Sequence, residues 1–317
     1  MFYIGIIFQR VSTYINKEQT RKERIANMGY DYENLCRDGA RLASAFGFLD
    51  MFSVGESVME RKILCFSLGN GERKLFINGA HHGLEYLTAA FIMKFLEDFA
   101  YFAKSGRQLL GYNLRSFLCN TTLFAIPMVN PDGVDIALHG LDLTAPRHRR
   151  LCSFVGIHNF GSVWQANANG VDINHNYDAA WRKVAPRPAP TRYCGPYAES
   201  EPETRAIVEF TKSVCPDILI AFHSQGREIY YDFNKKLAKS SLELARIFAR
   251  ESGYALAAPE EDASFGGCKD WFIDKFNRPG FTIEMGIGKN PLPLEMLDNI
   301  YEENAKIILC ALDYLQN

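Results

Sequence analysis

The sequence predicts one α/β domain: a mixed, mostly parallel and twisted β-sheet with helices on both faces. Short apolar runs of strand length alternate with longer segments in which apolar residues recur at helical spacing. The run at 217–222 is almost continuously apolar, which is typical of a strand buried on both faces of a parallel sheet. The 317 residues suffice for one large domain, and no repeat or linker divides residues 29–317. Residues 1–28 differ in character from the rest of the chain and are interpreted as an N-terminal extension that need not be well ordered.

The first predicted element is a helix over 31–46, where apolar residues recur at helical spacing. Strands are expected at 52–54 and 62–67. The turn residues Gly69-Asn70-Gly71 indicate a hairpin that joins the second of these strands to the next one, at 75–77.

The middle of the chain continues the alternation. A helix is expected from Glu85 to about Ala103, with a stripe of phenylalanines that packs in the core. A buried strand at 123–129 ends at Asn130-Pro131-Asp132-Gly133, a strong turn signal. Residues 138–170 show little periodicity and are expected to form a long loop, which in a compact domain is usually functional or disordered.

The last third completes the pattern. Ser200-Glu201-Pro202-Glu203-Thr204 has the spacing of a capping box, with proline suited to the first turn, so a helix should begin there. The apolar strand at 217–222 comes next and ends at His223. The remaining expected elements are a helix at about 239–252, a glycine-rich loop at 266–267, a strand at 281–283 and a helix at 292–315.

Bulk composition gives no support to some classes of partner. The 35 basic and 37 acidic residues nearly balance, so charge gives no reason to expect nucleic acid or an anionic membrane as a partner. The eight cysteines have no C-x-x-C spacing, and several lie in apolar runs, where a buried and reduced thiol is favoured, so we expect a reducing compartment. The apolar run at 1–8 is too short for a membrane span and lacks the flanks of a signal peptide, so we expect a cytoplasmic protein. The oligomeric state stays open.

A candidate metal site lies where the strand at 75–77 gives way to a helix. His82 and Glu85 are three residues apart at the helix entrance, so both side chains can reach one point beyond the strand. An imidazole nitrogen and a carboxylate oxygen suit zinc, which binds both at about 2.0 to 2.2 Å. About one such pair is expected by chance in this composition, so the motif needs partners elsewhere. His81, four residues before Glu85, is an alternative ligand.

Two further residues follow strands at the same predicted edge. His223 and Glu284 each come directly after a strand, and the ligand site of such sheets lies at the carboxyl ends of the strands. Three protein ligands with an open fourth position are typical of a catalytic zinc ion. Zinc acidifies a coordinated water, and Glu284 can take that proton and pass it to a leaving amine. The expected reaction is amide hydrolysis.

Six motifs occur in an order that resembles the zinc carboxypeptidases of the carboxypeptidase A superfamily, over about residues 30–317. These motifs are His82-Gly83-Leu84-Glu85, Asn130-Pro131-Asp132-Gly133, Gly170-Val171-Asp172-Ile173-Asn174-His175-Asn176-Tyr177, Ser200-Glu201-Pro202-Glu203-Thr204, His223-Ser224 and Thr282-Ile283-Glu284. The resemblance implies one zinc ion held by His82, Glu85 and His223, with Glu284 as general base. The expected fold is that of the superfamily.

Within that superfamily the chain most resembles bacterial γ-D-glutamyl-diamino acid peptidases, which cut cell-wall peptides. The stretches that carry this resemblance are Trp164-Gln165-Ala166-Asn167, 172–181, His223-Ser224-Gln225-Gly226, Gly267-Cys268-Lys269-Asp270-Trp271-Phe272 and Asn290-Pro291-Leu292-Pro293. The resemblance implies a murein-derived peptide as substrate and hydrolysis of the bond between the D-glutamate side chain and meso-diaminopimelate.

The chain departs from the digestive carboxypeptidases at the substrate-binding positions. Those enzymes have Asn-Arg where this chain has Asn174-His175, and histidine cannot form the charged bidentate clamp of a guanidinium. Asn174 and His175 remain candidates for substrate contact. Asp270 is a further candidate, for which packing of the loop by Asp270-Trp271 is the competing explanation.

An oxyanion-binding arginine is also not evident, because Trp164 is followed by Gln165 where a Trp-Arg pair would be expected. Arg149 and Arg150, together with Arg147, lie in the preceding segment. One of them is a candidate to supply the missing charge, against the alternative of a solvated cluster.

Two other functions compete with murein hydrolysis. One is a metallocarboxypeptidase for ordinary peptides, and the other is a binder that holds a murein peptide without turning it over. Glu284 argues against the binder, since a binder needs no base beside the metal. A thiol mechanism at Cys268 is not expected because no histidine partner is identified.

Overall fold

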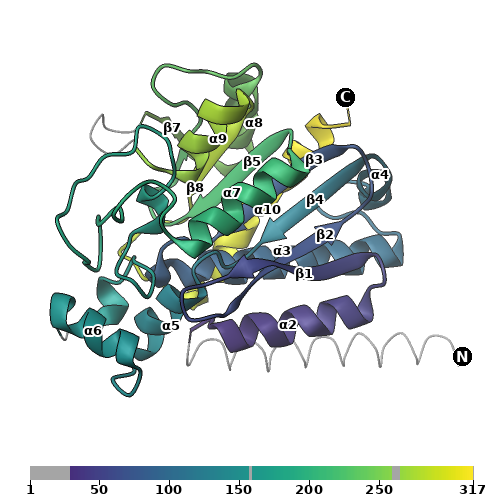
Figure 1. The fold of residues 1–317 in the computed structure, drawn as a ribbon. Coiled ribbons are helices and arrows are strands. Elements are labelled where there is room, and N and C mark those ends of the chain that lie inside the picture. Colours follow the sequence, from purple (N-terminus) through teal and green to yellow (C-terminus); the bar gives the residue numbers. More distant parts are fainter. Residues whose placement is uncertain (1–28, 157–158, 259–264, 317) are drawn as a thin grey trace, which may run out of the picture.

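A β-sheet runs through the centre of the computed structural model, which describes residues 29–156, 159–258 and 265–316 (Figure 1). The extension expected at residues 1–28 lies outside the described residues. The strands are β1 (Leu49–Glu56), β2 (Lys62–Leu68), β3 (Arg73–Gly79), β4 (Thr121–Ile126), β5 (Ile218–His223), β6 (Glu228–Tyr230), β7 (Ala255–Ala257) and β8 (Gly280–Glu284).

The eight described strands lie in the order β1-β2-β4-β3-β5-β8-β6-β7. The four central strands, β4, β3, β5 and β8, are parallel to one another. Antiparallel pairs join β1 to β2, β2 to β4 and β6 to β8. The sheet is therefore mixed with a parallel centre, which confirms the predicted fold class. Every residue of β5 is buried, as its continuous apolar run predicts.

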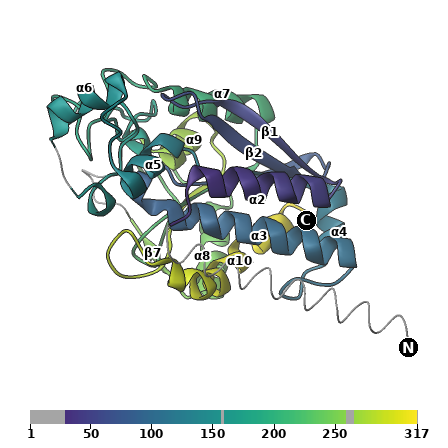
Figure 2. The ribbon, with the colours of Figure 1, turned by 90° about the horizontal axis from the view of Figure 1, so that it is seen from below.

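Helices cover both faces of the sheet. The described helices are α2 (Tyr32–Ala45), α3 (Tyr86–Ser105), α4 (Leu114–Asn120), α5 (Pro131–His139), α6 (Pro146–Val155), α7 (Pro202–Val214), α8 (Ser241–Ser252), α9 (Cys268–Phe276) and α10 (Leu297–Tyr314). One face packs against α2, α3, α8 and α10, and the other against α7 and α9, as Figures 1 and 2 show. None of these helices is both long and apolar enough to cross a membrane.

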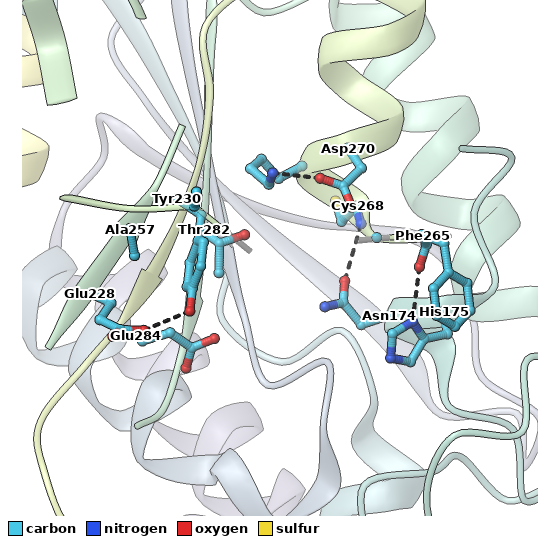
Figure 3. Close-up of a pocket in the computed structure, with 13 residues that line it drawn as sticks. Asn174, His175, Glu228, Tyr230, Ala257, Phe265, Cys268, Asp270, Thr282 and Glu284 are labelled. Carbon is cyan, nitrogen blue, oxygen red and sulfur yellow. Dashed lines mark hydrogen bonds and ion pairs between the residues drawn. The ribbon is translucent and has the colours of Figure 1, made fainter. Parts of the chain in front are cut away.

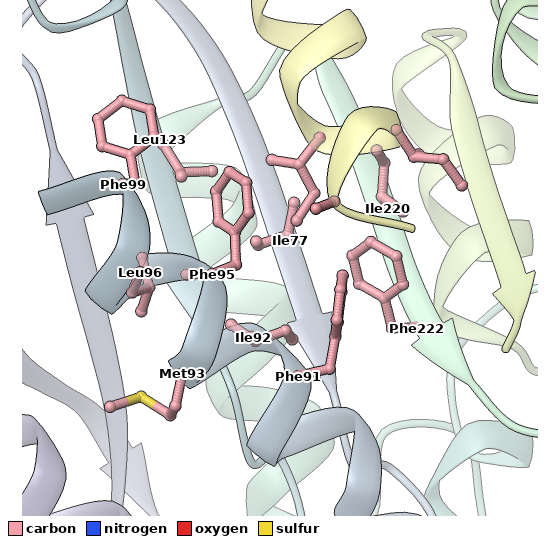
Figure 4. Close-up of a cluster of buried hydrophobic side chains, with 14 of the residues drawn as sticks. Ile77, Phe91, Ile92, Met93, Phe95, Leu96, Phe99, Leu123, Ile220 and Phe222 are labelled. Atoms are coloured by element: carbon pink, nitrogen blue, oxygen red, sulfur yellow. The ribbon is translucent and has the colours of Figure 1, made fainter. Parts of the chain in front are cut away.

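The phenylalanine stripe of α3 forms the centre of the larger core. Phe91 and Phe95 are fully buried and lie against side chains of the central strands, among them Ile77 and Phe222 (Figure 4). The next residue of β3 before Ile77, Phe76, belongs to the core on the opposite face. This alternation is the two-residue period of a strand. The burial of Phe91 and Phe95 confirms the core packing predicted for the stripe.

The predicted hairpin between β2 and β3 is wrong. In the sheet, β4 lies between β2 and β3, so these two strands do not pair. The consecutive strands that do pair in antiparallel fashion are β1 and β2. The loop at 69–71 passes close to the start of β4: Gly71 donates a hydrogen bond to the carbonyl oxygen of Thr121 at 3.2 Å. A Cβ on Gly71 would lie 2.0 Å from the carbonyl carbon of Asn120. Glycine is therefore required here for close approach of two backbones rather than for a hairpin turn.

Two expected irregular segments contain helices. The Asn130-Pro131-Asp132-Gly133 turn is the start of α5, where the Asn130 side chain accepts a hydrogen bond from the Gly133 amide at 2.8 Å. The long loop expected at 138–170 contains α6. The glycine-rich loop at 266–267 leads directly into α9, a helix that was not expected from the sequence.

The expected capping box at α7 is also wrong in detail. Pro202 is the first helical residue as predicted, but Glu201 precedes it and the Ser200 side chain does not cap the helix. The Ser200 hydroxyl instead accepts a hydrogen bond from Asn176 and donates one to Glu201. Glu203 is buried and accepts hydrogen bonds from the Val58 amide and from the Asn167 side chain, so tertiary contacts replace the local motif.

Candidate metal centre and adjoining cleft

The turn after β3 brings His82 and Glu85 to the carboxyl edge of the sheet. His82 precedes a short 3₁₀ turn, Gly83–Glu85, and α3 begins at the next residue. The Gly83 amide donates a hydrogen bond to the carbonyl oxygen of Gln165 at 3.1 Å. A Cβ on Gly83 would lie 2.2 Å from the carbonyl oxygen of Gly133, so glycine lets this turn pack closely against the start of α5.

Three potential ligand atoms converge at this edge. His82 Nδ1 lies 2.8 Å from Glu85 Oε1, and His223 Nδ1 lies 3.0 Å from Glu85 Oε2. His223 is the last residue of β5, which is hydrogen-bonded to β3, so residues far apart in sequence meet here. Potential ligand atoms of His82, Glu85 and His223 all lie within 4.8 Å of one another.

His81 is not part of this group. Its side chain is fully buried, and its Nε2 is hydrogen-bonded to the Tyr177 hydroxyl at 2.9 Å. Its ring stacks on that of His223 with 5.5 Å between centroids. Burial, together with the nearby imidazoles of His223 and His82, holds the pKa of His81 well below its usual range. His81 is therefore a neutral packing partner behind the cluster, and the alternative ligand left open by the sequence receives no support.

Asp172 is a residue of the site whose role was not predicted from the sequence. Its buried carboxylate lies 3.3 Å from His82 Nε2, on the side of the ring opposite to Glu85. Burial opposes ionisation of Asp172, but His175 and His82 outweigh it and hold the pKa of Asp172 well below its usual range. Burial likewise opposes a proton on His82, yet Glu85 and Asp172 raise the pKa of His82. A charged carboxylate behind a metal-ligating imidazole fixes its tautomer and orientation.

The donor set fits a zinc ion. Two imidazole nitrogens and one carboxylate oxygen are ligand types that zinc prefers, and three protein ligands leave a position open. Both Nδ1 atoms face the same buried carboxylate, and the second nitrogen of His82 is held by Asp172.

Glu284 lies next to this group at the end of β8. It is the register partner of His223 across the parallel β5–β8 pair. The side chain is partly buried and lines a cleft of ≈ 500 Å³. Burial and the neighbouring charge of Glu85 raise the pKa of Glu284 well above its ordinary value. The structure therefore brings together all four residues predicted to form the centre.

The cleft has two walls, which Figure 3 shows face to face. Glu228, Tyr230 and Thr282 stand beside Glu284 on one wall, which comes from β6 and β8. The other wall contains Asn174, His175 and Asp270 from the segment after Asp172 and from the start of α9.

The predicted substrate residues Asn174, His175 and Asp270 thus line one cleft. Asn174 also supports the wall, because its side-chain oxygen accepts a hydrogen bond from the Cys268 amide at 3.1 Å. His175 stacks on Phe265 with 4.5 Å between ring centroids.

The structure does not bring Arg149 and Arg150 to this cleft. Arg149 donates hydrogen bonds to the carbonyl oxygens of Leu143 and Thr144. Arg150 lines a second hollow of ≈ 740 Å³ beside α6. The cation that does line the cleft is the buried Lys269, which in the sequence stood out only as part of a motif.

Comparisons with known proteins identify a matching family, similar sequences and similar folds. A family model described as zinc carboxypeptidase matches residues 41–307. The gamma-D-glutamyl-L-diamino acid endopeptidase 1 of Lysinibacillus sphaericus is 35% identical over 288 residues, which cover 89% of this chain and 72% of that protein. Similar folds occur in thrombin-activatable fibrinolysis inhibitor (TM-score 0.75, 18% identity, 90% of this chain and 74% of that chain). Murein-tripeptide amidase MpaA from Escherichia coli O157 also has a similar fold (TM-score 0.53, 20% identity, 84% of this chain and 92% of that chain).

Proposed function

Because the chain belongs to the zinc carboxypeptidase family and is a metallopeptidase, we propose that it hydrolyses an amide bond of cell-wall (murein) peptides with one zinc ion per chain. The bond that we propose joins the side-chain carboxyl of D-glutamate to meso-diaminopimelate. Support for this substrate comes from the endopeptidase of L. sphaericus, whose name states a γ-D-glutamyl bond to a diamino acid.

His82, Glu85 and His223 are the proposed zinc ligands. The convergence of their two nitrogens and one carboxylate beside Glu284 is the observation that carries the proposal. A zinc ion in this position supplies Lewis acidity, which lowers the pKa of a coordinated water toward about 7 and polarises a neighbouring carbonyl. Asp172 holds the His82 ring in place.

Glu284 is the proposed general base. Its carboxylate takes a proton from the attacking water and delivers it to the leaving amine. Burial raises the pKa of Glu284, so its carboxylate holds a proton more strongly than an exposed one, which suits this transfer. Asn174, His175 and Asp270 are proposed to contact the substrate, because they line the cleft that Glu284 also lines.

Metal analysis followed by a peptide digest tests the proposal. Purified protein should contain about one zinc per chain, and mass spectrometry of digested muropeptides should show cleavage at the γ-glutamyl bond. Glu284→Gln should retain the zinc and lose turnover, while an exposed control, Glu302→Gln on α10, should retain both. Cleavage of an ordinary tripeptide but not of L-Ala-γ-D-Glu-meso-diaminopimelate would identify a general metallocarboxypeptidase. Tight peptide binding without any wild-type turnover would identify a binder.

The cytoplasm is the proposed location. All eight cysteines are free thiols, which is consistent with a reducing compartment. Murein fragments taken up for recycling, or formed during sporulation, would be the substrates there.

A further inference from the structure

We propose that the ion pair of Lys269 and Asp270 selects the substrate, by recognising the carboxylate and the ammonium at the far end of a diamino acid. This inference rests on the proposed function and deepens it. It predicts discrimination between meso-diaminopimelate, whose far end carries both groups, and lysine, whose far end carries an ammonium alone.

The ion pair is buried at the wall of the cleft that also holds Glu284. Lys269 and Asp270 are 6% and 5% exposed, and Lys269 Nζ lies 2.5 Å from Asp270 Oδ1. Lys269 also donates a hydrogen bond to the carbonyl oxygen of Asp232 at 2.5 Å. Both residues belong to the first turn of α9, which is packed through Trp271 and Phe272 into the core. The pair is therefore held in a fixed position relative to the reacting centre.

A purely structural role explains the pair poorly. Removing two charges from water is costly, and a buried ion pair often stabilises a fold no better than apolar residues of similar volume. Among the described residues, the Lys269 ammonium donates a hydrogen bond to the Asp232 carbonyl oxygen and forms an ion pair with Asp270, whereas an ammonium can donate three hydrogen bonds. A charged pair at the wall of a substrate cleft is therefore better explained by recognition of a charged ligand.

The charged side chains that line the cleft indicate which of them contacts the carboxylate of the ligand and which contacts its ammonium. Glu228, Asp270 and Glu284 are the acidic side chains that line the described part of the cleft. Apart from the imidazole of His175, Lys269 is the only cationic side chain in that lining. Without Lys269 the cleft would attract an ammonium and repel a carboxylate. Lys269 is thus the residue that admits the second, carboxylate-bearing end of diaminopimelate, while Asp270 and Glu228 face its ammonium.

Paired substrates test this directly. The zinc-loaded wild-type protein should cleave L-Ala-γ-D-Glu-meso-diaminopimelate with a higher kcat/KM than L-Ala-γ-D-Glu-L-Lys. Lys269→Met should lower that preference about 10- to 100-fold, mainly through KM for the diaminopimelate peptide, because a carboxylate would then meet no cation. The matched control is Lys275→Met on the same helix, whose partner Asp178 lies on the surface. It should leave the preference unchanged.

A second variant guards against misfolding. Lys269→Met alone leaves Asp270 buried without its partner, whereas the double variant Lys269→Met/Asp270→Leu removes both charges and should also lose the preference. An unchanged preference in a folded variant of either kind would overturn the inference.

Binding separates this inference from the proposed reaction. Calorimetric titration of free meso-diaminopimelate and of L-lysine into zinc-loaded protein should show tighter binding of diaminopimelate, lost in Lys269→Met. If neither peptide is cleaved but this binding difference is found, the reaction is wrong and the selectivity stands. If both peptides are cleaved equally well and bind equally, the selectivity is wrong and the reaction stands.

Discussion

Replacing Asp172 by asparagine should weaken zinc binding without removing a ligand. The Asp172 carboxylate lies 3.3 Å from His82 Nε2 and is buried, so water screens the contact little. Asparagine has nearly the same shape and can still accept the hydrogen bond from the Arg192 amide. What it lacks is the charge that keeps the ring in one tautomer and makes His82 a better donor.

Partners of this kind typically change metal affinity 10- to 100-fold, which corresponds to about 1.4 to 2.7 kcal/mol. Competition between the protein and a fluorescent zinc chelator measures the change. Asp178→Asn, at an exposed carboxylate, serves as the control and should bind zinc like wild type. Equal zinc affinities for wild type and Asp172→Asn would refute the idea that Asp172 orients a ligand.

Three further predictions concern stability. Phe95→Ala should lower the free energy of unfolding by about 3 to 5 kcal/mol in urea titrations, because a fully buried ring leaves a cavity between α3 and the sheet; a loss below 1 kcal/mol would contradict this packing. Burial, with the charge of Asp132, raises the pKa of Glu203 from 4.5 to about 8. The folded state then keeps a proton that the unfolded state releases, so this stabilisation is complete below about pH 4.5 and is lost as the pH rises toward 8. Between about pH 5 and pH 8 the free energy of unfolding of the wild type should therefore fall by about 3 kcal/mol more than that of Glu203→Gln. Parallel pH profiles of the two unfolding free energies would disprove this. Arg61→Met should destabilise the fold by about 3 kcal/mol, because Arg61 Nη1 lies 2.7 Å from Asp132, whose carboxylate would remain buried without this cation; an unchanged melting temperature would count against it.

Local sequence patterns predicted the centre of the fold and the four residues that meet there. The continuous apolar run of β5 requires burial on both faces, and His223 at its end therefore lies at the sheet edge. Glu284 follows from the same reasoning applied to β8. Parallel strands share one carboxyl edge, so the meeting of these residues needed no knowledge of their distance along the chain.

The remaining features depend on contacts that no local pattern contains. Gly69-Asn70-Gly71 marks a tight passage of the backbone, but whether β3 or β4 lies beside β2 depends on the whole sheet. The helix α9 is short, and its Trp271 and Phe272 are buried because they pack against the face of the sheet that α7 and α9 cover. Asp172 and Lys269 look like ordinary charged residues in sequence, since only the folded chain shows what faces them.

The position of the cleft within the sheet has a consequence for how substrate preference can change in evolution. The proposed zinc ligands lie at the ends of β3 and β5 in the middle of the sheet, whereas Ala257 of the cleft comes from the edge strand β7, and Glu228 and Tyr230 come from β6 next to it. An edge strand such as β7 has one hydrogen-bonded neighbour, so a change there requires fewer strands to adapt. The wall that ends in β7 can therefore change with little effect on the central strands that carry the proposed zinc ligands.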